Sequence, residues 1–412
     1  MDLARADALA ARSRLTARGW IPKNSESFRH IPPPALDVWL GDAADAPALG
    51  CDASPLAGAG WTLHPIGNSR QARVDAQWLD AADAAQRAEL FANLALPGDG
   101  DAAPFAWAHR AAVRRGLRLR IGGAGRESGE TVWLQLRHQP REAVESPMLV
   151  IEVAPNVRCV LIETHDHEHT ACDHAIVQNL QVHLRLAQDA TLQHLRIANP
   201  RADDRIAHHL HAQLDRGARY DQALIASGSR YHLQRSEVEL HADRASARNA
   251  SVLFAAGSVM EQQLRMSHAA ADTRSSVDAL VLASGRAQAV VNAHTRIAPG
   301  ADEADVRQRL SGIPTSGQPR LVLRPHLEIH HDKVQAAHGA TWGALPEDAL
   351  FYAQQRGLDE RRARGLIVEG MARAVLERCL DEPEVLQTLA LDERLAAAAA
   401  RHLASEEESV HG

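Results

Sequence analysis

Residues 217–258 read GARYDQALIASGSRYHLQRSEVELHADRASARNASVLFAAGS, and small-residue turns interrupt this stretch at nearly even intervals. The turns fall at Gly217-Ala218, Gly228-Ser229, Asp243-Arg244-Ala245 and Gly257-Ser258. Similar turns recur on both sides of this stretch, at Asp189-Ala190, Asp203-Asp204, Asp272-Thr273, Arg286-Ala287 and Gly300-Ala301. Their spacing stays near 14 residues, since 28 residues separate Ala190 from Ala218 and 14 separate Ala287 from Ala301. A fixed period of this kind predicts a solenoid.

The segments between the turns alternate apolar and polar residues, as β-strands do. Leu210, Ala212 and Leu214 follow this pattern, and so does the segment 291–297. A sandwich or an up-and-down barrel is the alternative, because hairpins also recur at short intervals. Few Asn-Gly or Asp-Gly turns and only 4% aromatic residues favour the solenoid. We therefore predict stacked parallel coils over residues 117–335. The side chains expected to point inward are Leu195, Leu210, Leu214, Leu264 and Ile297.

The sequence on either side of the repeat has a helical character. Residues 2–18 and 75–96 are predicted to be helices, with irregular Pro- and Gly-rich sequence between them. After the repeat, Pro346 and Asp359 begin two further predicted helices, and an Ala-rich third is expected over residues 384–403, followed by a frayed tail. We divide the chain into an N-terminal helical region with irregular linkers (1–115), a β core (116–341) and a C-terminal helical region (342–412).

Composition narrows the classes of function. The net charge of −7 disfavours nucleic acid, whose phosphates a negative chain repels. No apolar stretch is long enough for a membrane span, and no signal peptide is recognisable at the start, so we expect a cytoplasmic protein. The four cysteines, Cys51, Cys159, Cys172 and Cys379, are widely separated and are expected to be free thiols.

Histidine is abundant, at 23 residues, and its densest group is HDHEHTACDH at residues 165–174. On an extended strand His165, His167 and His169 would share one face and could bind iron or zinc. We favour the alternative of a solvated loop, because no partner for these ligands is evident from the sequence. The histidines of residues 207–211 are interpreted as an exposed strand face. Walker, Gly-x-Ser-x-Gly and Cys-x-x-Cys motifs are all missing from the sequence.

The strongest local signature lies near the end of the repeat. It runs through Pro325-His326-Leu327-Glu328-Ile329, then Val334 to Thr341 with the core Ala337-His338-Gly339-Ala340-Thr341, then Leu350-Phe351-Tyr352 and Arg356-Gly357. In order and spacing these residues resemble the closing segment of the SufB/SufD family. Residues 22–29, PKNSESFR, resemble the N-terminal segment of the same family more weakly.

The resemblance implies a mainly β fold in which a right-handed parallel β-helix lies between N-terminal and C-terminal α-helical regions. It also implies a scaffold without turnover of its own. Family members pair through their β-helices, here with a SufB-like subunit, and dock a SufC-like ABC-type ATPase that hydrolyses ATP. An isolated chain could form a homodimer. No cofactor is expected to stay bound to the chain alone, and an iron–sulfur cluster would be held transiently in the complex.

Three departures bear on which branch of the family the chain resembles. SufB-like sequences have glutamate after the motif histidine, where this chain has Gly339, and they have an essential late cysteine, whereas here none occurs between Cys172 and Cys379. Both differences favour the SufD branch. Some SufD-like sequences carry a cysteine two residues before the motif histidine, and here Ala336 stands in that place. With no cysteine between Cys172 and Cys379, the sulfur-accepting thiolate chemistry cannot lie in the late coils of this chain.

The resemblance assigns roles to two groups of residues. His338 and Gly339 would lie at the cluster-assembly interface, with His338 as an iron ligand shared with the partner. Phe351, Tyr352, Arg356 and Gly357 would belong to the surface that docks the ATPase, or Phe351 and Tyr352 would only seal the end of the β core. Two alternative functions remain: a structural adaptor with no part in a cluster site, and a β-helix enzyme acting on polysaccharide, which the scarcity of aromatic residues disfavours.

Overall fold

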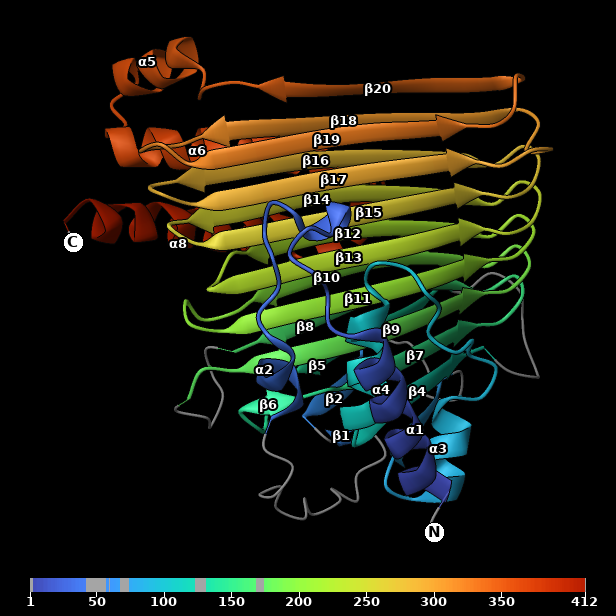
Figure 1. Ribbon diagram of the computed structural model, residues 1–412. Helices are drawn as coiled ribbons and strands as arrows, with labels where there is room; N and C mark the ends of the chain where they lie inside the picture. The colour runs from blue at the N-terminus through green and yellow to red at the C-terminus, as the bar shows by residue number, and fades with distance from the viewer. Residues whose placement is uncertain are drawn as a thin grey trace.

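A computed structural model describes residues 3–41, 57–58, 60–66, 74–122, 131–167 and 174–411. Two long sheets run face to face through the molecule, and from β7 onward consecutive strands alternate between them (Figure 1). Between β7 and β20, nearly every pairing is parallel and joins strands about one coil apart; Thr191, for example, is paired with Arg219, 28 residues later. The predicted parallel β-helix is therefore confirmed, and the alternative of antiparallel hairpins is wrong for the repeat.

The first sheet begins with two short strands and continues with one strand from each coil. Its members, in order, are β1 (Ala57–Gly58), β2 (Trp61–Pro65), β5 (Val132–His138), β8 (Arg158–Asp166), β10 (Thr191–Asn199), β12 (Arg219–Ser227), β14 (Ser246–Ala256), β16 (Arg274–Ser284), β18 (Ala304–Pro314) and β20 (Val334–Trp342). β2 pairs antiparallel with β5, whereas β5 and the later strands are parallel.

The second sheet completes each coil. Its members, in order, are β3 (Val74–Asp80), β4 (Arg115–Ile121), β7 (Met148–Val153), β9 (Val177–Leu186), β11 (Arg205–Leu214), β13 (Tyr231–Leu240), β15 (Val259–His268), β17 (Gln288–Ile297) and β19 (Arg320–Ile329), and the short β6 (Val144–Glu145) pairs with β9. β3 is antiparallel to β4. Antiparallel strands thus precede the coils in both sheets.

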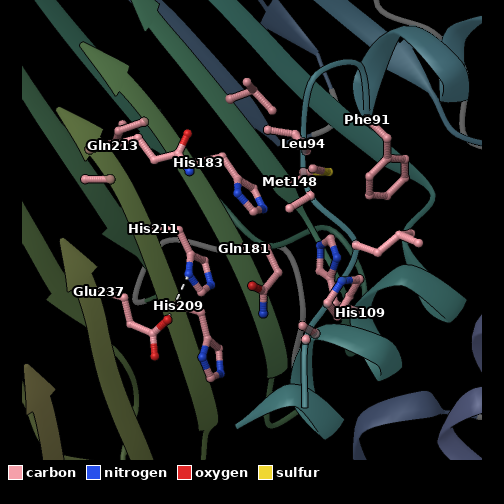
Figure 2. Close-up of a pocket in the computed structure, with 18 of the residues that line it drawn as sticks. Phe91, Leu94, His109, Met148, Gln181, His183, His209, His211, Gln213 and Glu237 are labelled. Atoms are coloured by element: carbon pink, nitrogen blue, oxygen red, sulfur yellow. Dashed lines mark ion pairs between the residues drawn. The ribbon is translucent and has the colours of Figure 1, made fainter. Parts of the chain in front are cut away.

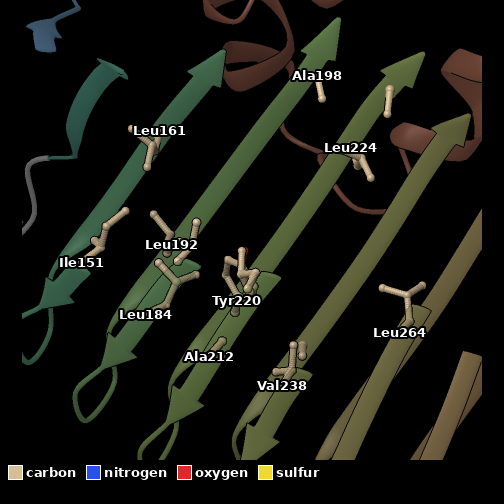
Figure 3. Close-up of a cluster of buried hydrophobic side chains, with 14 of the residues drawn as sticks. Ile151, Leu161, Leu184, Leu192, Ala198, Ala212, Tyr220, Leu224, Val238 and Leu264 are labelled. Carbon is tan, nitrogen blue, oxygen red and sulfur yellow. The ribbon is translucent and has the colours of Figure 1, made fainter. Parts of the chain in front are cut away.

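The space between the two sheets holds the largest apolar core of the described residues (Figure 3). Inward side chains on one strand lie beside inward side chains of the next coil, as Leu186, Leu214 and Leu240 do. Leu210, Leu214 and Leu264 belong to this core, as predicted, and Ile297 is buried in a smaller cluster at the end of the coils. Since each coil buries apolar surface only against its neighbours, the stack is stable as a whole.

Leu195 is buried, but not between the sheets. It lies on the outer face of the first sheet, in a cluster with Val160, Ile197 and residues of the C-terminal helices. Those helices are α6 (Glu360–Leu376), α7 (Pro383–Thr388) and α8 (Leu391–His411). The inward assignment of Leu195 is therefore wrong. Parallel sheets are usually covered on both faces, so an apolar residue can point either way.

The N-terminal elements cover the outer face of the second sheet (Figure 1). They are α1 (Leu3–Arg18), the 3-10 helix η1 (Glu26–Phe28), α2 (Leu36–Leu40), α3 (Ala84–Leu90) and α4 (Ala103–Ala112). The segment around η1 lies along β15 and β17, because Gln263 Nε2 donates to the Ser27 carbonyl at 2.8 Å and Gln288 Nε2 donates to the His30 carbonyl at 2.6 Å. No helix in the ranges that the structure covers is long and apolar enough to cross a membrane.

Two helix predictions are wrong in part. Residues 75–96 contain a strand, β3, because Ala76, Trp78 and the polar residues between them alternate; a helix starts only at Ala84, where Asp83 caps it by accepting from the Ala85 and Gln86 amides. The helix expected over residues 384–403 is divided into α7 and α8 at Ala390, whose φ is 47°. The tail predicted to fray continues in α8 to His411.

Glu261 is a buried carboxyl group beneath the N-terminal segment. It is 1% exposed, and its Oε1 accepts from Gln263 Nε2 at 2.8 Å. Burial raises the pKa of Glu261 to about 8. The unfolded chain releases the Glu261 proton above the usual pKa of 4.5, whereas the folded chain keeps it up to about pH 8. The free energy of unfolding therefore falls as the pH rises from 4.5 through about 8.

We expect Glu261→Gln to remove this loss. Between pH 4.5 and about 8, each pH unit lowers the free energy of unfolding of the natural chain by at most about 1.4 kcal/mol. Urea unfolding at pH 5, 7 and 8.5 measures the effect, and Glu239→Gln on β13 is the control because Glu239 is exposed. Equal pH slopes for Glu261→Gln and the natural chain would contradict the prediction.

Candidate functional site

The last coil leaves one end of the solenoid open (Figure 1). β19 and β20 are the final strands of their sheets, and within the described chain no strand pairs with their outer edges. All nine residues of β20 are exposed or half-buried, and Trp342 and Ile329 are 61% and 44% exposed. Unpaired edges of this length offer backbone hydrogen-bonding groups to another chain. The end formed by β19 and β20 is called the open end below.

The predicted site residue His338 lies at the open end. It is exposed, and its register partner on β18 is Gln308, whose side chain is buried between the sheets. Residues paired in register share one face of a parallel sheet, so His338 continues the inward face beyond the last covered coil. Gln308 is held by hydrogen bonds from its Nε2 to Thr295 Oγ1 at 2.8 Å and to the His326 carbonyl at 3.2 Å.

Gly339, the neighbour of His338, has open space around it. A methyl group added at its Cα would meet no heavy atom of the described residues within 4 Å. The φ of Gly339 is also not in the left-handed region, which is the region that favours glycine. Neither packing within the chain nor backbone conformation therefore requires glycine here. A second molecule approaching β20 would be a physical reason for it.

A second histidine group lies on the outward face of β17 and β19 near the same end. His294 and His330 both face the carboxylate of Glu328, at 3.3 and 2.7 Å, and the rings of His294 and His326 are 4.7 Å apart. Arg296 also pairs with Glu328, at 3.3 Å. The group is a network of surface ion pairs, and across the described ranges no three ligating side chains are placed to hold a metal ion.

The second group of predicted site residues lies on α5 (Glu347–Gln355), which follows β20. None of its side chains is buried, and Phe351 and Tyr352 are 63% and 61% exposed. Arg356 lies over the Tyr352 ring at 5.1 Å and donates to its hydroxyl at 2.8 Å. Gly357 ends the helix with a φ of 89°. This degree of exposure disfavours a purely sealing role for Phe351 and Tyr352.

The histidines at 165–167 are not in a solvated loop. His165 and His167 are each 1% exposed and point into the solenoid; Nε2 of His165 faces Glu163 Oε1 at 2.6 Å, and Nδ1 of His167 faces Asp204 Oδ2 at 2.9 Å. The interpretation as a solvated loop is therefore wrong for these two residues: His165 lies on β8, which extends to Asp166, and His167 follows the strand but is buried against Asp204. Residues 168–173 lie outside the described residues, and with them His169 and Cys172.

A polar network lies inside the early coils, and the sequence alone gives no sign of it. Glu163 is fully buried on β8 and faces Arg196 at 2.9 Å and His194 at 3.0 Å. Burial raises the pKa of Glu163, but Arg196 and the flanking histidines outweigh this and lower it well below 4.5. On the facing sheet, His208 Nε2 donates to Gln178 Oε1 at 2.6 Å, and Gln234 donates to His208 Nδ1 at 3.2 Å.

The network does not reach the open end. Along the first sheet, the inward row that contains His194, Gln222 and Asn249 continues with Val277 before it comes to Gln308 and His338. Val277 is 1% exposed and belongs to the apolar core. Apolar packing thus separates the buried polar network from the site at His338.

A cavity of about 440 Å³ lies on the outer face of the second sheet, beneath the segment that joins α3 to α4 (Figure 2). Its lining includes His109, His183, His209 and His211, and we call it the histidine pocket. His208 and His209 are 1% and 2% exposed, so the predicted exposed strand face is wrong at both positions. His208 points inward and His209 outward beneath the N-terminal region, which packs against it through Phe105 at 4.9 Å.

Three imidazoles of the histidine pocket, those of His109, His183 and His209, are held in the neutral form by burial. Burial lowers the pKa of His183 and of His209 well below 6.5, and burial likewise lowers that of His109 to about 4. Nε2 of His109 donates to the Pro147 carbonyl at 2.9 Å, whereas Nε2 of His209 is buried without a hydrogen-bond partner in the described chain. Sequence alone could not find this pocket, because it joins residues from α4, β9 and β11.

Known proteins resemble the chain over the solenoid. Residues 136–371 match the family described as SUF system FeS cluster assembly, SufBD core domain. The chain is 26% identical over 251 residues to an iron-sulfur cluster assembly SufBD family protein of Synechocystis, covering 58% of this chain and 54% of that protein. It is 22% identical over 268 residues to the iron-sulfur cluster assembly protein SufD of Escherichia coli, covering 59% of this chain and 62% of that protein.

The aligned part is thus about half to three fifths of the length of these two relatives. A SufBD family protein of Mycobacterium leprae is 32% identical over a shorter stretch of 111 residues, which covers 26% of this chain and 27% of that protein. The family match spans β5 to α6, and thus includes the coils, the open end and α5. Since it extends over more than half of the 412 residues, the chain belongs to the SufBD core family of the SUF system for iron–sulfur cluster assembly.

Proposed function

We propose that this chain is a SufD-type scaffold subunit that assembles iron–sulfur clusters together with a SufB-like subunit and a SufC-like ABC-type ATPase. The observation that carries the proposal is the position of His338, exposed on the last strand of an open-ended solenoid. A partner β-helix placed against β20 would bring its own residues beside this imidazole. The cluster would be cargo, held only while the complex is intact.

The chemistry at the interface would be divided between the two scaffold chains. Thiolates are the usual iron ligands in clusters. Of this chain's cysteines, Cys159 and Cys379 are buried. Burial raises the pKa of both thiols well above its usual value, so neither readily forms a thiolate. The partner would therefore supply the thiolate and this chain the imidazole of His338, which as a neutral base can bind iron. Turnover would reside in the ATPase.

The direct test is co-expression with SufB-like and SufC-like proteins, followed by measurement of the mass, iron and sulfide of the purified complex. Formation of a complex that carries iron and sulfide would support the proposal. A complex that assembles but never holds iron or sulfide would favour the structural adaptor instead. A chain that remains a homodimer in the presence of both proteins would contradict the proposed partners.

We further propose that α5 docks the ATPase through Phe351 and Tyr352, whose exposed rings are typical of interface anchors. Deletion of the chain after Thr341 is a poor test, because it would also remove α6, α7 and α8 and uncover the apolar outer face of the first sheet. Two point substitutions remove the rings and leave those helices in place.

We expect the double variant Phe351→Ala, Tyr352→Ala to bind the ATPase at least about 30-fold more weakly, since a central anchor contributes about 2 kcal/mol or more. Affinity measured by titration of the purified subunits checks the result. The control is Leu9→Ala, which removes a 45% exposed apolar side chain from α1. Unchanged affinity in the double variant, with unchanged folding, would show that α5 is not the docking element.

A further inference from the structure

We propose that the histidine pocket binds a divalent metal ion of the zinc class through His183, His209 and His211. These three residues lie on the outer face of the second sheet, far along the solenoid from His338. The proposal is independent of the cluster-assembly role: it concerns a resident ion of this chain and not the cluster.

The arrangement of the three residues on the sheet suits a common ligand. His209 and His211 are two residues apart on β11 and point to the same side, and His183 is the register partner of His211 on β9. Strand geometry places such positions about 5 to 7 Å apart, within reach of three imidazoles that converge above the sheet. The rings of His183 and His211 are already stacked, 5.2 Å apart and 17° from parallel.

The three side chains do not yet meet at one point, since within the described residues no group of three is close enough to hold a metal. A metal ion would draw them together by side-chain rotation into the cavity that they line (Figure 2). Zinc binds imidazole nitrogen at about 2.0–2.1 Å, so each of the three rings would have to turn toward the common point.

The ring nitrogens are disposed for ligation. Nε2 of His209 is buried and has no hydrogen-bond partner within the described chain, although the residue is only 2% exposed. Nδ1 of His211 faces Glu237 Oε2 at 3.4 Å. A carboxylate in this place holds the proton on Nδ1 and leaves Nε2 free for a metal, the usual arrangement of a metal-bound histidine. His109 is excluded, because its Nε2 is bonded to the Pro147 carbonyl.

The charges around the site and the type of its ligands limit which metal ions could bind. Three arginines also line the pocket, Arg110, Arg185 and Arg235; Arg110 is paired with Asp7 at 2.8 Å and Arg235 with Glu237. Three nitrogen ligands suit zinc, cobalt or nickel, whereas magnesium and calcium prefer oxygen. Three protein ligands would leave a fourth position open toward the cavity for water or a small anion.

Titration of the full-length chain with Co²⁺ tests the proposal, because the visible absorption of Co²⁺ reports coordination by nitrogen. We expect one site that Zn²⁺ displaces. Three variants each remove one proposed ligand: His183→Ala, His211→Ala and the more conservative His209→Gln. Loss of a hydrogen-bond partner of a ligand lowers metal affinity by about 10- to 100-fold. Loss of a ligand itself should lower the affinity by at least as much. Glu237→Gln, which changes the partner of His211, should weaken binding by about 10- to 100-fold.

The matched control is His326→Ala, which removes an exposed imidazole from the histidine group near the open end. It should leave the Co²⁺ site unchanged, and circular dichroism should show that every variant is folded. The proposal is overturned if the natural chain shows no such site, if the pocket variants retain it, or if His326→Ala abolishes it equally. None of these results depends on cluster assembly.

Discussion

Replacing Leu214 with aspartate is expected to unfold the whole solenoid in one transition. Leu214 is fully buried on β11, and its register partners in the neighbouring coils are Leu186 and Leu240. Aspartate would leave a cavity between these residues and place an unpaired carboxylate in it. Cavity formation alone costs about 2–5 kcal/mol, and burial of the charge adds to that. The total is comparable to the stability of an ordinary domain.

The neighbouring position supplies the control. Gln213 lies on the same strand but is exposed on its outer face, so Gln213→Asp introduces the same charge without burying it. Urea unfolding followed by circular dichroism should show Gln213→Asp close to the natural chain and Leu214→Asp unfolded without denaturant. A folded Leu214→Asp chain, with a midpoint near that of the natural chain, would contradict the account of the core.

The architecture of the repeat was predictable because the turn spacing directly reflects the coil. One half-coil consists of a strand and a turn, and the turns near Ala190, Ala218 and Ala245 lie just before β10, β12 and β14. Among the described residues, five non-glycine residues of positive φ lie near such turns, for example Asp189, Arg244 and Asp272. The alternation of Leu210, Ala212 and Leu214 then gave the inward face of β11 correctly.

The alternation of residues along a strand does not show which face of the first sheet points inward. Leu192 and Leu195 are both buried on β10, one between the sheets and the other beneath the C-terminal helices. The same ambiguity concealed the inward polar residues: Glu163 and Arg196 look like surface residues in the sequence, yet they pair inside the solenoid. Their partners come from different strands, and only the register brings them together.

The candidate site could be predicted in position but not in detail. The motif around His338 lies at the close of the repeat, and the structure has it on the last strand. What the sequence did not reveal is that no residue of this strand is buried and that His338 follows Gln308 on the inward face. The histidine pocket could not be predicted at all, since its chemistry depends on the pairing of β9 with β11.

The second large effect is expected from His338→Ala in the complex with the proposed partners. His338 is exposed, and neither a hydrogen bond nor a buried contact in the described chain depends on its ring. The substitution should therefore leave the folding of this subunit unchanged. If the imidazole is an iron ligand, its loss removes one of the few groups that hold the nascent cluster, and cluster content should fall at least about tenfold.

A histidine of similar setting provides the control. His330 follows β19 at the same end of the solenoid, is also exposed, and its ring pairs with Glu328. His330→Ala removes an imidazole from this region without altering β20. A loss of cluster in both variants would point to a general disturbance of the open end, whereas a loss in His338→Ala alone identifies the ring itself.

The most direct measurement is the iron and acid-labile sulfide content of the His338→Ala complex, purified with the same subunit stoichiometry as the natural complex. Native mass analysis of each preparation establishes that stoichiometry first. We expect iron and sulfide per complex to fall sharply in His338→Ala and to stay at the natural level in His330→Ala. Iron and sulfide that remain unchanged in a correctly assembled His338→Ala complex would rule out an iron-binding role and leave His338 with a structural one.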